Sequence, residues 1–150
     1  MNTPDVVEIL LVEDNPSDLA LTQRALKKAR LANHLHVCRD GEEALNFLFG
    51  EGGHQGRRAG SFPRVVLLDL KLPKIDGLEV LRRLKADPRT KTIPVVMLTS
   101  SREQRDVIES YNLGVNSYIV KPVNFEGFSA AVEQLGLYWL LVNQSPDQER

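Results

Sequence analysis

The chain has 150 residues, the length of one ordinary domain. Hydrophobic residues make up 42% and charged residues 26%, which is typical of a globular protein rather than a disordered one. The 19 basic and 20 acidic residues give a formal net charge of −1, so no general basic field would attract nucleic acid or an anionic membrane. The single cysteine, Cys38, excludes an internal disulfide framework and a zinc site built from several thiolates.

Signals for export and membrane insertion are not found in the sequence. The first ten residues have no basic region ahead of an apolar stretch, as a signal peptide would have. The longest apolar run, over residues 137–142, is far too short to span a bilayer. We therefore expect a cytoplasmic protein that binds neither nucleic acid nor membrane.

Apolar runs and amphipathic segments alternate along the chain. Five short apolar runs predict buried strands, and the segments between them show the three- and four-residue spacing of helices. Asn15 is a good N-cap and Pro16 a good first helical residue for the first of these helices. The strands are expected over residues 6–12, 35–38, 65–68, 93–98 and 118–120, and the helices over residues 16–30, 42–49, 78–84, 102–111 and from 125 onward.

This alternation predicts the fold class. Strands that are apolar throughout and separated by helices indicate an α/β protein, whose parallel sheet is doubly wound and covered on both faces. Residues 50–63 contain five glycines without periodicity and predict a loop. We expect an N-terminal extension over residues 1–5, one domain over residues 6–142 and a flexible tail over residues 143–150.

Polar residues follow four of the five predicted strands. Ligands of open parallel sheets bind beyond the carboxyl ends of the strands. Taken singly, each residue has an ordinary structural explanation, such as a turn, a helix cap or a solvated lysine. Their occurrence at one edge of a sheet favours a shared site. They are Glu13 and Asp14 after the first strand, Asp69 after the third, Thr99 after the fourth and Lys121 after the fifth.

These residue types suggest phosphoryl chemistry. Three carboxylates close together repel one another unless a cation neutralises them. Magnesium does so with oxygen ligands, keeps several waters and leaves room for a phosphate group. A lysine and a hydroxyl can then bind the phosphoryl group, and a carboxylate can accept it as an aspartyl phosphate.

The chain resembles the receiver domain of two-component response regulators over about residues 6–142. The motifs that carry the resemblance are Glu13-Asp14, Asp69 in LLDLKLP, Asp76-Gly77, Thr99 in MLTSS, Tyr118, and Lys121-Pro122 in YIVKP. The resemblance implies a flavodoxin-like sheet of five parallel strands in the order 2-1-3-4-5, with five helices.

The resemblance also assigns roles within a magnesium site. Asp69 would accept a phosphoryl group from a phosphohistidine on a sensor histidine kinase. Asp14 would bind Mg2+ directly and Glu13 through water, while Asp69 and the backbone carbonyl of Lys71 would be further ligands. One departure is Glu13, where many family members have aspartate, and a longer arm should be tolerated at a water-mediated position.

The remaining implied roles concern the response to phosphorylation. Lys121 and Thr99 would contact the phosphoryl group. Thr99 would move toward it, and Tyr118 would follow inward as the second switch residue. The bond between Lys121 and Pro122 would be cis, which only a following proline makes plausible.

A narrower resemblance concerns the end of the chain. The segment LGLYWLLVNQSP, with EDNPSD and the glycine-rich loop, is similar to small stand-alone regulators paired with phytochrome-type kinases. We expect a signalling switch that catalyses only its own phosphorylation and dephosphorylation, and whose output is a set of phosphorylation-dependent protein contacts.

The predicted last helix is apolar on every side near its end, which indicates burial against something. One interpretation is a homodimer or kinase contact through the fourth helix, the fifth strand and the fifth helix. The other is that the tail folds back on its own domain. The candidate interface residues are Tyr111, Tyr118, Leu137, Tyr138, Leu140 and Leu141.

Three alternative functions remain at this point. A phosphate-independent adaptor or dimerisation module would keep the fold without the chemistry. An aspartate-nucleophile phosphohydrolase needs a second aspartate two residues after the nucleophile, where this chain has Lys71. A flavin carrier needs a phosphate-cradling loop, and the acidic EDNPSD segment would repel the phosphate. The cognate kinase, the output partner, the lifetime of the phosphorylated state and any link between phosphorylation and dimerisation are left open.

Overall fold

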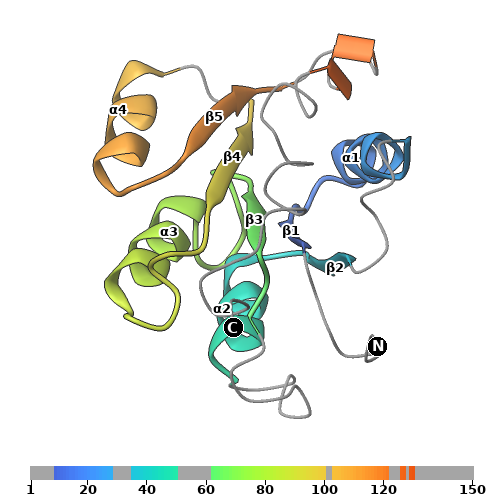
Figure 1. The fold of residues 1–150 in the computed structure, drawn as a ribbon. Coiled ribbons are helices and arrows are strands. Elements are labelled where there is room, and N and C mark those ends of the chain that lie inside the picture. Colours follow the sequence, from blue (N-terminus) through green and yellow to red (C-terminus); the bar gives the residue numbers. More distant parts are fainter. Residues whose placement is uncertain are drawn as a thin grey trace, which may run out of the picture.

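The computed structural model describes residues 9–28, 35–50, 62–100, 103–121, 126–127 and 129–130 (Figure 1). Five strands and four helices lie within the described part of the chain. They are β1 (Ile9–Val12), α1 (Pro16–Lys28), β2 (Leu35–Cys38), α2 (Gly41–Phe49), β3 (Val65–Leu68), α3 (Gly77–Ala86), β4 (Val95–Thr99), α4 (Gln104–Asn112) and β5 (Ser117–Val120). The N-terminal extension, most of the glycine-rich loop, most of the predicted fifth helix and the C-terminal tail lie outside the described residues.

The strands form one parallel sheet in the order β2-β1-β3-β4-β5. This confirms the predicted fold class and strand order. The order places β1 and β3 beside each other, with β4 and β5 following β3 toward one edge. The carboxyl ends of β1, β3, β4 and β5 therefore meet along one side of the sheet.

Two apolar layers hold the sheet between the helices. Side chains of a strand alternate between the two faces, so Leu10 and Val12 of β1 join one cluster while Ile9 and Leu11 join the other. The first cluster includes buried residues of α2 and α3, and the second those of α1. Figure 1 accordingly shows α1 on one side of the sheet and α2 and α3 on the other. Because both faces are covered, β1 is apolar at every position.

The start of α1 confirms the predicted cap. The helix begins at Pro16, and the Asn15 side-chain oxygen accepts a hydrogen bond of 3.0 Å from the backbone N–H of Asp18. This bond orients the first turn of α1 beside the end of β1.

The fourth strand is shifted from its predicted position over residues 93–98. It runs from Val95 to Thr99, because Ile93 donates its backbone N–H to the carbonyl of Thr90 in a turn. Ile93 is nevertheless buried in the core, so its apolar character reflects packing outside the sheet. Within the described residues, no helix is long and apolar enough to cross a membrane.

Candidate functional site

Backbone hydrogen bonds fix the residues that follow the strands. The N–H of Asp69 donates to the carbonyl of Val12 at 3.1 Å, which ties the end of β3 to β1. The N–H of Lys121 donates to the carbonyl of Thr99 at 2.7 Å, which ties the end of β5 to β4. The predicted site residues are therefore held by the sheet itself.

Three carboxylates lie together at this edge. Glu13, Asp14 and Asp69 each offer a carboxylate oxygen within 4.8 Å of the others. Glu13 and Asp69 are buried and Asp14 is exposed, so the cluster opens to solvent on the side of Asp14. Clustered hard oxygen donors with one open side suit a divalent cation such as Mg2+, which keeps part of its water shell.

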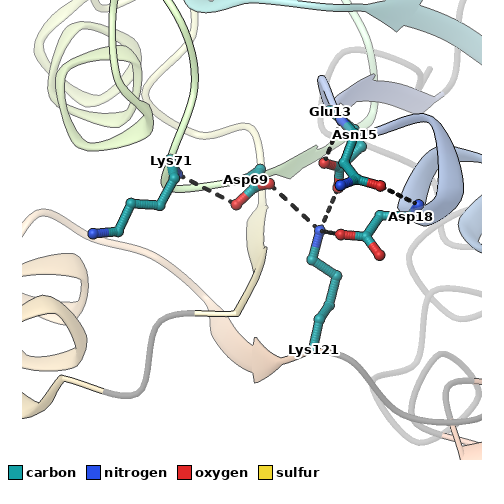
Figure 2. A network of polar contacts seen from close by, with 6 residues as sticks. All are labelled: Glu13, Asn15, Asp18, Asp69, Lys71 and Lys121. Atoms are coloured by element: carbon teal, nitrogen blue, oxygen red, sulfur yellow. Dashed lines mark hydrogen bonds and ion pairs between the residues drawn. The ribbon is translucent and has the colours of Figure 1, made fainter.

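A buried ammonium group lies beside the carboxylates of Glu13 and Asp69 (Figure 2). It belongs to Lys121, which is only 2% exposed. Its Nζ donates a hydrogen bond to Glu13 Oε1 and lies 3.4 Å from Asp69 Oδ2. The ammonium group compensates part of the negative charge, so the folded chain can bury two of these acidic side chains.

Burial and neighbouring charges shift the pKa values of Glu13 and Lys121. Burial raises the pKa of Glu13, the hydrogen bond from Lys121 lowers it and the charge of Asp69 raises it, with a result of about 7. Burial lowers the pKa of Lys121, but the hydrogen bond to Glu13, the charges of Asp69 and Glu13 and the bond to Asp18 outweigh this effect and raise it. Lys121 is therefore charged at neutral pH, and Glu13 exchanges its proton near neutral pH.

The connection between β3 and α3 shapes the surroundings of Asp69. The backbone N–H of Lys71 donates to Asp69 Oδ1 at 3.3 Å, while the Lys71 side chain points away from Asp69 (Figure 2). Gly77 donates its N–H to the carbonyl of Leu70 at 2.8 Å. A Cβ atom at Gly77 would lie 2.1 Å from the backbone oxygen of Asp69, so only glycine allows this approach.

Asp76, the first residue of the predicted Asp76-Gly77 motif, also has a structural role. It is the N-cap of α3, and its carboxylate accepts a hydrogen bond of 3.0 Å from the N–H of Glu79. The motif therefore starts α3 and places its first turn directly against the backbone of Asp69 and Leu70, which follow β3.

The remaining predicted residues lie on β4, β5 and α4 or outside the described part of the chain. Thr99 is fully buried as the last residue of β4. Tyr118 lies on β5 opposite Met97 and packs against the apolar cluster of α2 and α3. Tyr111 on α4 is 50% exposed. Pro122 and the interface candidates Leu137, Tyr138, Leu140 and Leu141 lie outside the described residues, so the cis bond and the predicted interface remain predictions.

Sequence reasoning gave no role to Asp18. Its Oδ2 lies 3.0 Å from Lys121 Nζ, whereas Asp69 Oδ2 lies 3.4 Å from the same nitrogen atom. The available signal was its position in the first turn of a helix that begins just after Glu13-Asp14. The first turn of such a helix lies at the same edge of the sheet as the strand ends.

The protein is therefore a doubly wound α/β protein. Its candidate site lies at the carboxyl ends of the strands and combines three carboxylates with a buried lysine. A family model described as the response regulator receiver domain matches residues 9–133. The chain therefore belongs to the response regulator receiver domain family.

Two relatives match almost their whole length. The probable methanogenesis regulatory protein FilR2 of Methanothrix harundinacea is 44% identical over 153 residues, covering 97% of this chain and 96% of FilR2. The response regulator Rcp1 of Synechocystis is 42% identical over 139 residues, covering 93% of this chain and 91% of Rcp1.

Solved structures show the same architecture. The phosphorylated cyanobacterial phytochrome response regulator RcpA is 40% identical with a TM-score of 0.82, over 94% of this chain and 99% of RcpA. The Mn2+-bound form of Rcp1 is 41% identical with a TM-score of 0.81, over 93% of this chain and 99% of that chain. These similarities confirm the predicted resemblance to receiver domains and to phytochrome-associated regulators.

Proposed function

We propose that this protein is a single-domain response regulator that accepts a phosphoryl group on Asp69 from a phosphohistidine of a sensor histidine kinase. The observation that carries the proposal is the position of Lys121 Nζ, buried among the carboxylates and 3.4 Å from Asp69 Oδ2. A fixed cation beside a carboxylate nucleophile is what phosphoryl transfer to that carboxylate requires.

In the transfer step, a carboxylate oxygen of Asp69 attacks the phosphorus atom of the phosphohistidine. A phosphorus–oxygen bond forms, the phosphorus–nitrogen bond breaks, and the imidazole nitrogen keeps the electron pair and takes a proton from solvent. Lys121 offsets the charge on the transferring group, and the Thr99 hydroxyl donates to one of its oxygens.

The acidic cluster fits Mg2+ as the cofactor. Asp14 and Asp69 would bind it directly, Glu13 would bind through water, and the backbone carbonyl of Lys71 would be a further ligand. The bound ion would neutralise charge on the carboxylates and on the phosphoryl oxygens. The similarity to the Mn2+-bound form of Rcp1 supports a divalent cation at this site.

The output of the switch would be a change in protein contacts rather than turnover of a substrate. Thr99 would move toward the phosphoryl group and Tyr118 would turn inward, which alters the face formed by α4 and β5. We place a homodimer contact on this face, with the predicted fifth helix and Tyr111 taking part. The similarity to RcpA and Rcp1 favours a phytochrome-like sensor kinase as the partner.

Intact-mass measurement after incubation with acetyl phosphate and Mg2+ tests the proposal. The wild-type chain should gain the mass of one phosphoryl group, and the gain should disappear when Mg2+ is chelated before the donor is added. Asp69→Asn should show no gain under the same conditions. A wild-type chain that gains no mass even with a phosphorylated histidine kinase would support the phosphate-independent adaptor instead.

A further inference from the structure

The ammonium group of Lys121 has three carboxylate partners. A lysine ammonium group has three donor hydrogens. Lys121 Nζ donates to Glu13 Oε1, to Asp18 Oδ2 at 3.0 Å and to Asp69 Oδ2 at 3.4 Å. Figure 2 shows Asp69 on one side of the nitrogen atom and Asp18 on another. The donors of Lys121 are therefore fully engaged before any phosphoryl group is present.

Asp18 contacts the ammonium group of Lys121 and is not one of the three clustered carboxylates. The carboxylates that converge on a possible metal position are those of Glu13, Asp14 and Asp69. Asp18 contacts Lys121 from the first turn of α1, and its backbone N–H is held by the Asn15 cap. The cap and the helix therefore keep the Asp18 side chain beside the ammonium group.

A phosphoryl group on Asp69 needs one of these contacts to give way. The Lys121 ammonium can reach a new oxygen only by releasing a carboxylate, because it has no fourth donor. Glu13 is 1% exposed, so solvent cannot take the place of the ammonium group beside its carboxylate. The Asp18 side chain is 27% exposed, so water can replace the ammonium group at small cost.

We propose that Asp18 is a positioning residue that holds Lys121 in the unphosphorylated protein and competes with the phosphoryl group for its ammonium group. The inference rests on the proposed function, since it concerns the same site. A contact made only before phosphorylation stabilises the unphosphorylated form, so Asp18 shifts the equilibrium toward that form.

The test measures the affinity for beryllofluoride, a non-covalent stand-in for the phosphoryl group, by calorimetric titration at saturating Mg2+. Asp18→Asn should bind it more tightly than the wild type, by about two- to fivefold for a partly exposed ion pair. Asp18→Glu, which keeps the charge, should return toward wild-type affinity. An unchanged or weaker affinity of Asp18→Asn would overturn the inference, because a phosphoryl oxygen would then simply take the place of Asp69 Oδ2.

Two controls separate the contact from general charge effects. Glu79 occupies the same position in α3 as Asp18 in α1, with its N–H on the cap residue, so Glu79→Gln should leave the affinity unchanged. In a Lys121→Met background, Asp18→Asn should give no gain, because a double-mutant cycle isolates the effect transmitted through the lysine. A gain that persists in this background would also overturn the inference.

The failure of the proposed function would look different. A wild-type chain that binds no beryllofluoride at any Mg2+ concentration would contradict the phosphoryl site itself, and the inference with it. Thermal unfolding of each variant verifies that it is folded under the titration conditions.

Discussion

Glu13 is the residue at which proton binding would compete with the proposed metal binding. Its carboxylate is 1% exposed, accepts from Lys121 and also accepts a hydrogen bond of 3.2 Å from the N–H of Asn15. Burial raises the pKa of Glu13 to about 7, although the hydrogen bond from Lys121 acts in the opposite direction. A divalent cation needs the ionised carboxylate, so its binding must displace the proton.

The first prediction is that Mg2+ affinity falls as the pH is lowered through 7. Below this pH Glu13 is protonated and contributes no charge, so calorimetry should show affinity lower by roughly three- to tenfold near pH 6 than near pH 8. Glu13→Gln should bind Mg2+ more weakly at the higher pH and lose this pH dependence. Equal wild-type affinities at both values would contradict the assignment.

The same pKa sets the sign of the stability change without metal. The pKa of Glu13 is raised from 4.5 to about 7, so the folded protein holds the proton more tightly than the unfolded chain does. The resulting stability is complete below pH 4.5 and is lost as the pH rises through 7. Mg2+ should offset this loss because it favours the ionised carboxylate in the folded protein.

At the residue scale, strand ends were the informative positions in the sequence. Glu13, Asp14, Asp69 and Lys121 could be predicted because the backbone alone places them at one edge. Asp18 could not, because its contact depends on the rotation of α1 and on the reach of the lysine side chain across the site. A pattern of residue types does not encode either quantity.

At the element scale, two helices begin in close contact with the connection from β3 to α3. A Cβ atom at Gly41 would lie 1.8 Å from the carbonyl oxygen of Ile75, and the N–H of Gly41 donates to the carbonyl of Pro73. Lys74, which lies between Pro73 and Ile75, has a φ of 70°. Its Nζ atom lies 3.7 Å from Asp40 Oδ2. Contacts at the starts of α2 and α3 therefore fix the path of the chain that follows Asp69.

The prediction at this scale concerns Gly77. Gly77→Ala forces the first turn of α3 away from the backbone of Asp69 and should destabilise the protein by about 1–3 kcal/mol. Asp69, the proposed acceptor, would be displaced with it and should be phosphorylated by acetyl phosphate roughly tenfold more slowly or worse. Chemical denaturation and the initial rate of mass gain measure the two effects.

Gly50→Ala is the matched control. Gly50 ends α2 with a φ of 74°, and a Cβ atom added there would have no atom within 4 Å. Alanine at this position therefore costs about 1 kcal/mol of backbone strain without a clash. The variant should lose stability but keep the wild-type rate. Equal rates for Gly77→Ala and the wild type would show that this close approach does not position Asp69.

Element boundaries show where sequence reasoning reached its limit. The strand over 65–68 and the first residue of α1 were predicted correctly, because apolar runs and a cap residue mark them directly. The start of β4 was wrong by two residues, because Ile93 is apolar for burial in the core and not for pairing in the sheet. Hydrophobicity records burial, and burial extends beyond regular structure.

At the scale of the whole molecule, strand order decides whether the site exists. Asp69 lies next to Glu13-Asp14 only because β3 pairs with β1 in register, with Leu68 opposite Val12. The apolar pattern of the strands is the same for any order, so the pattern predicted a parallel sheet and the family resemblance supplied the order. The pairing of β1 with β3 therefore brings acidic residues that are far apart in the chain to the same edge of the sheet.

The location of the phosphoryl group tests the role of Asp69 most directly. Borohydride converts an aspartyl phosphate to homoserine, so reduction of the phosphorylated protein followed by peptide mass mapping identifies the acceptor residue. We expect homoserine at position 69 alone, with unmodified aspartate at Asp14 and Asp18. Homoserine at either of those positions, or a phosphorylated chain that yields none, would contradict Asp69 as the acceptor.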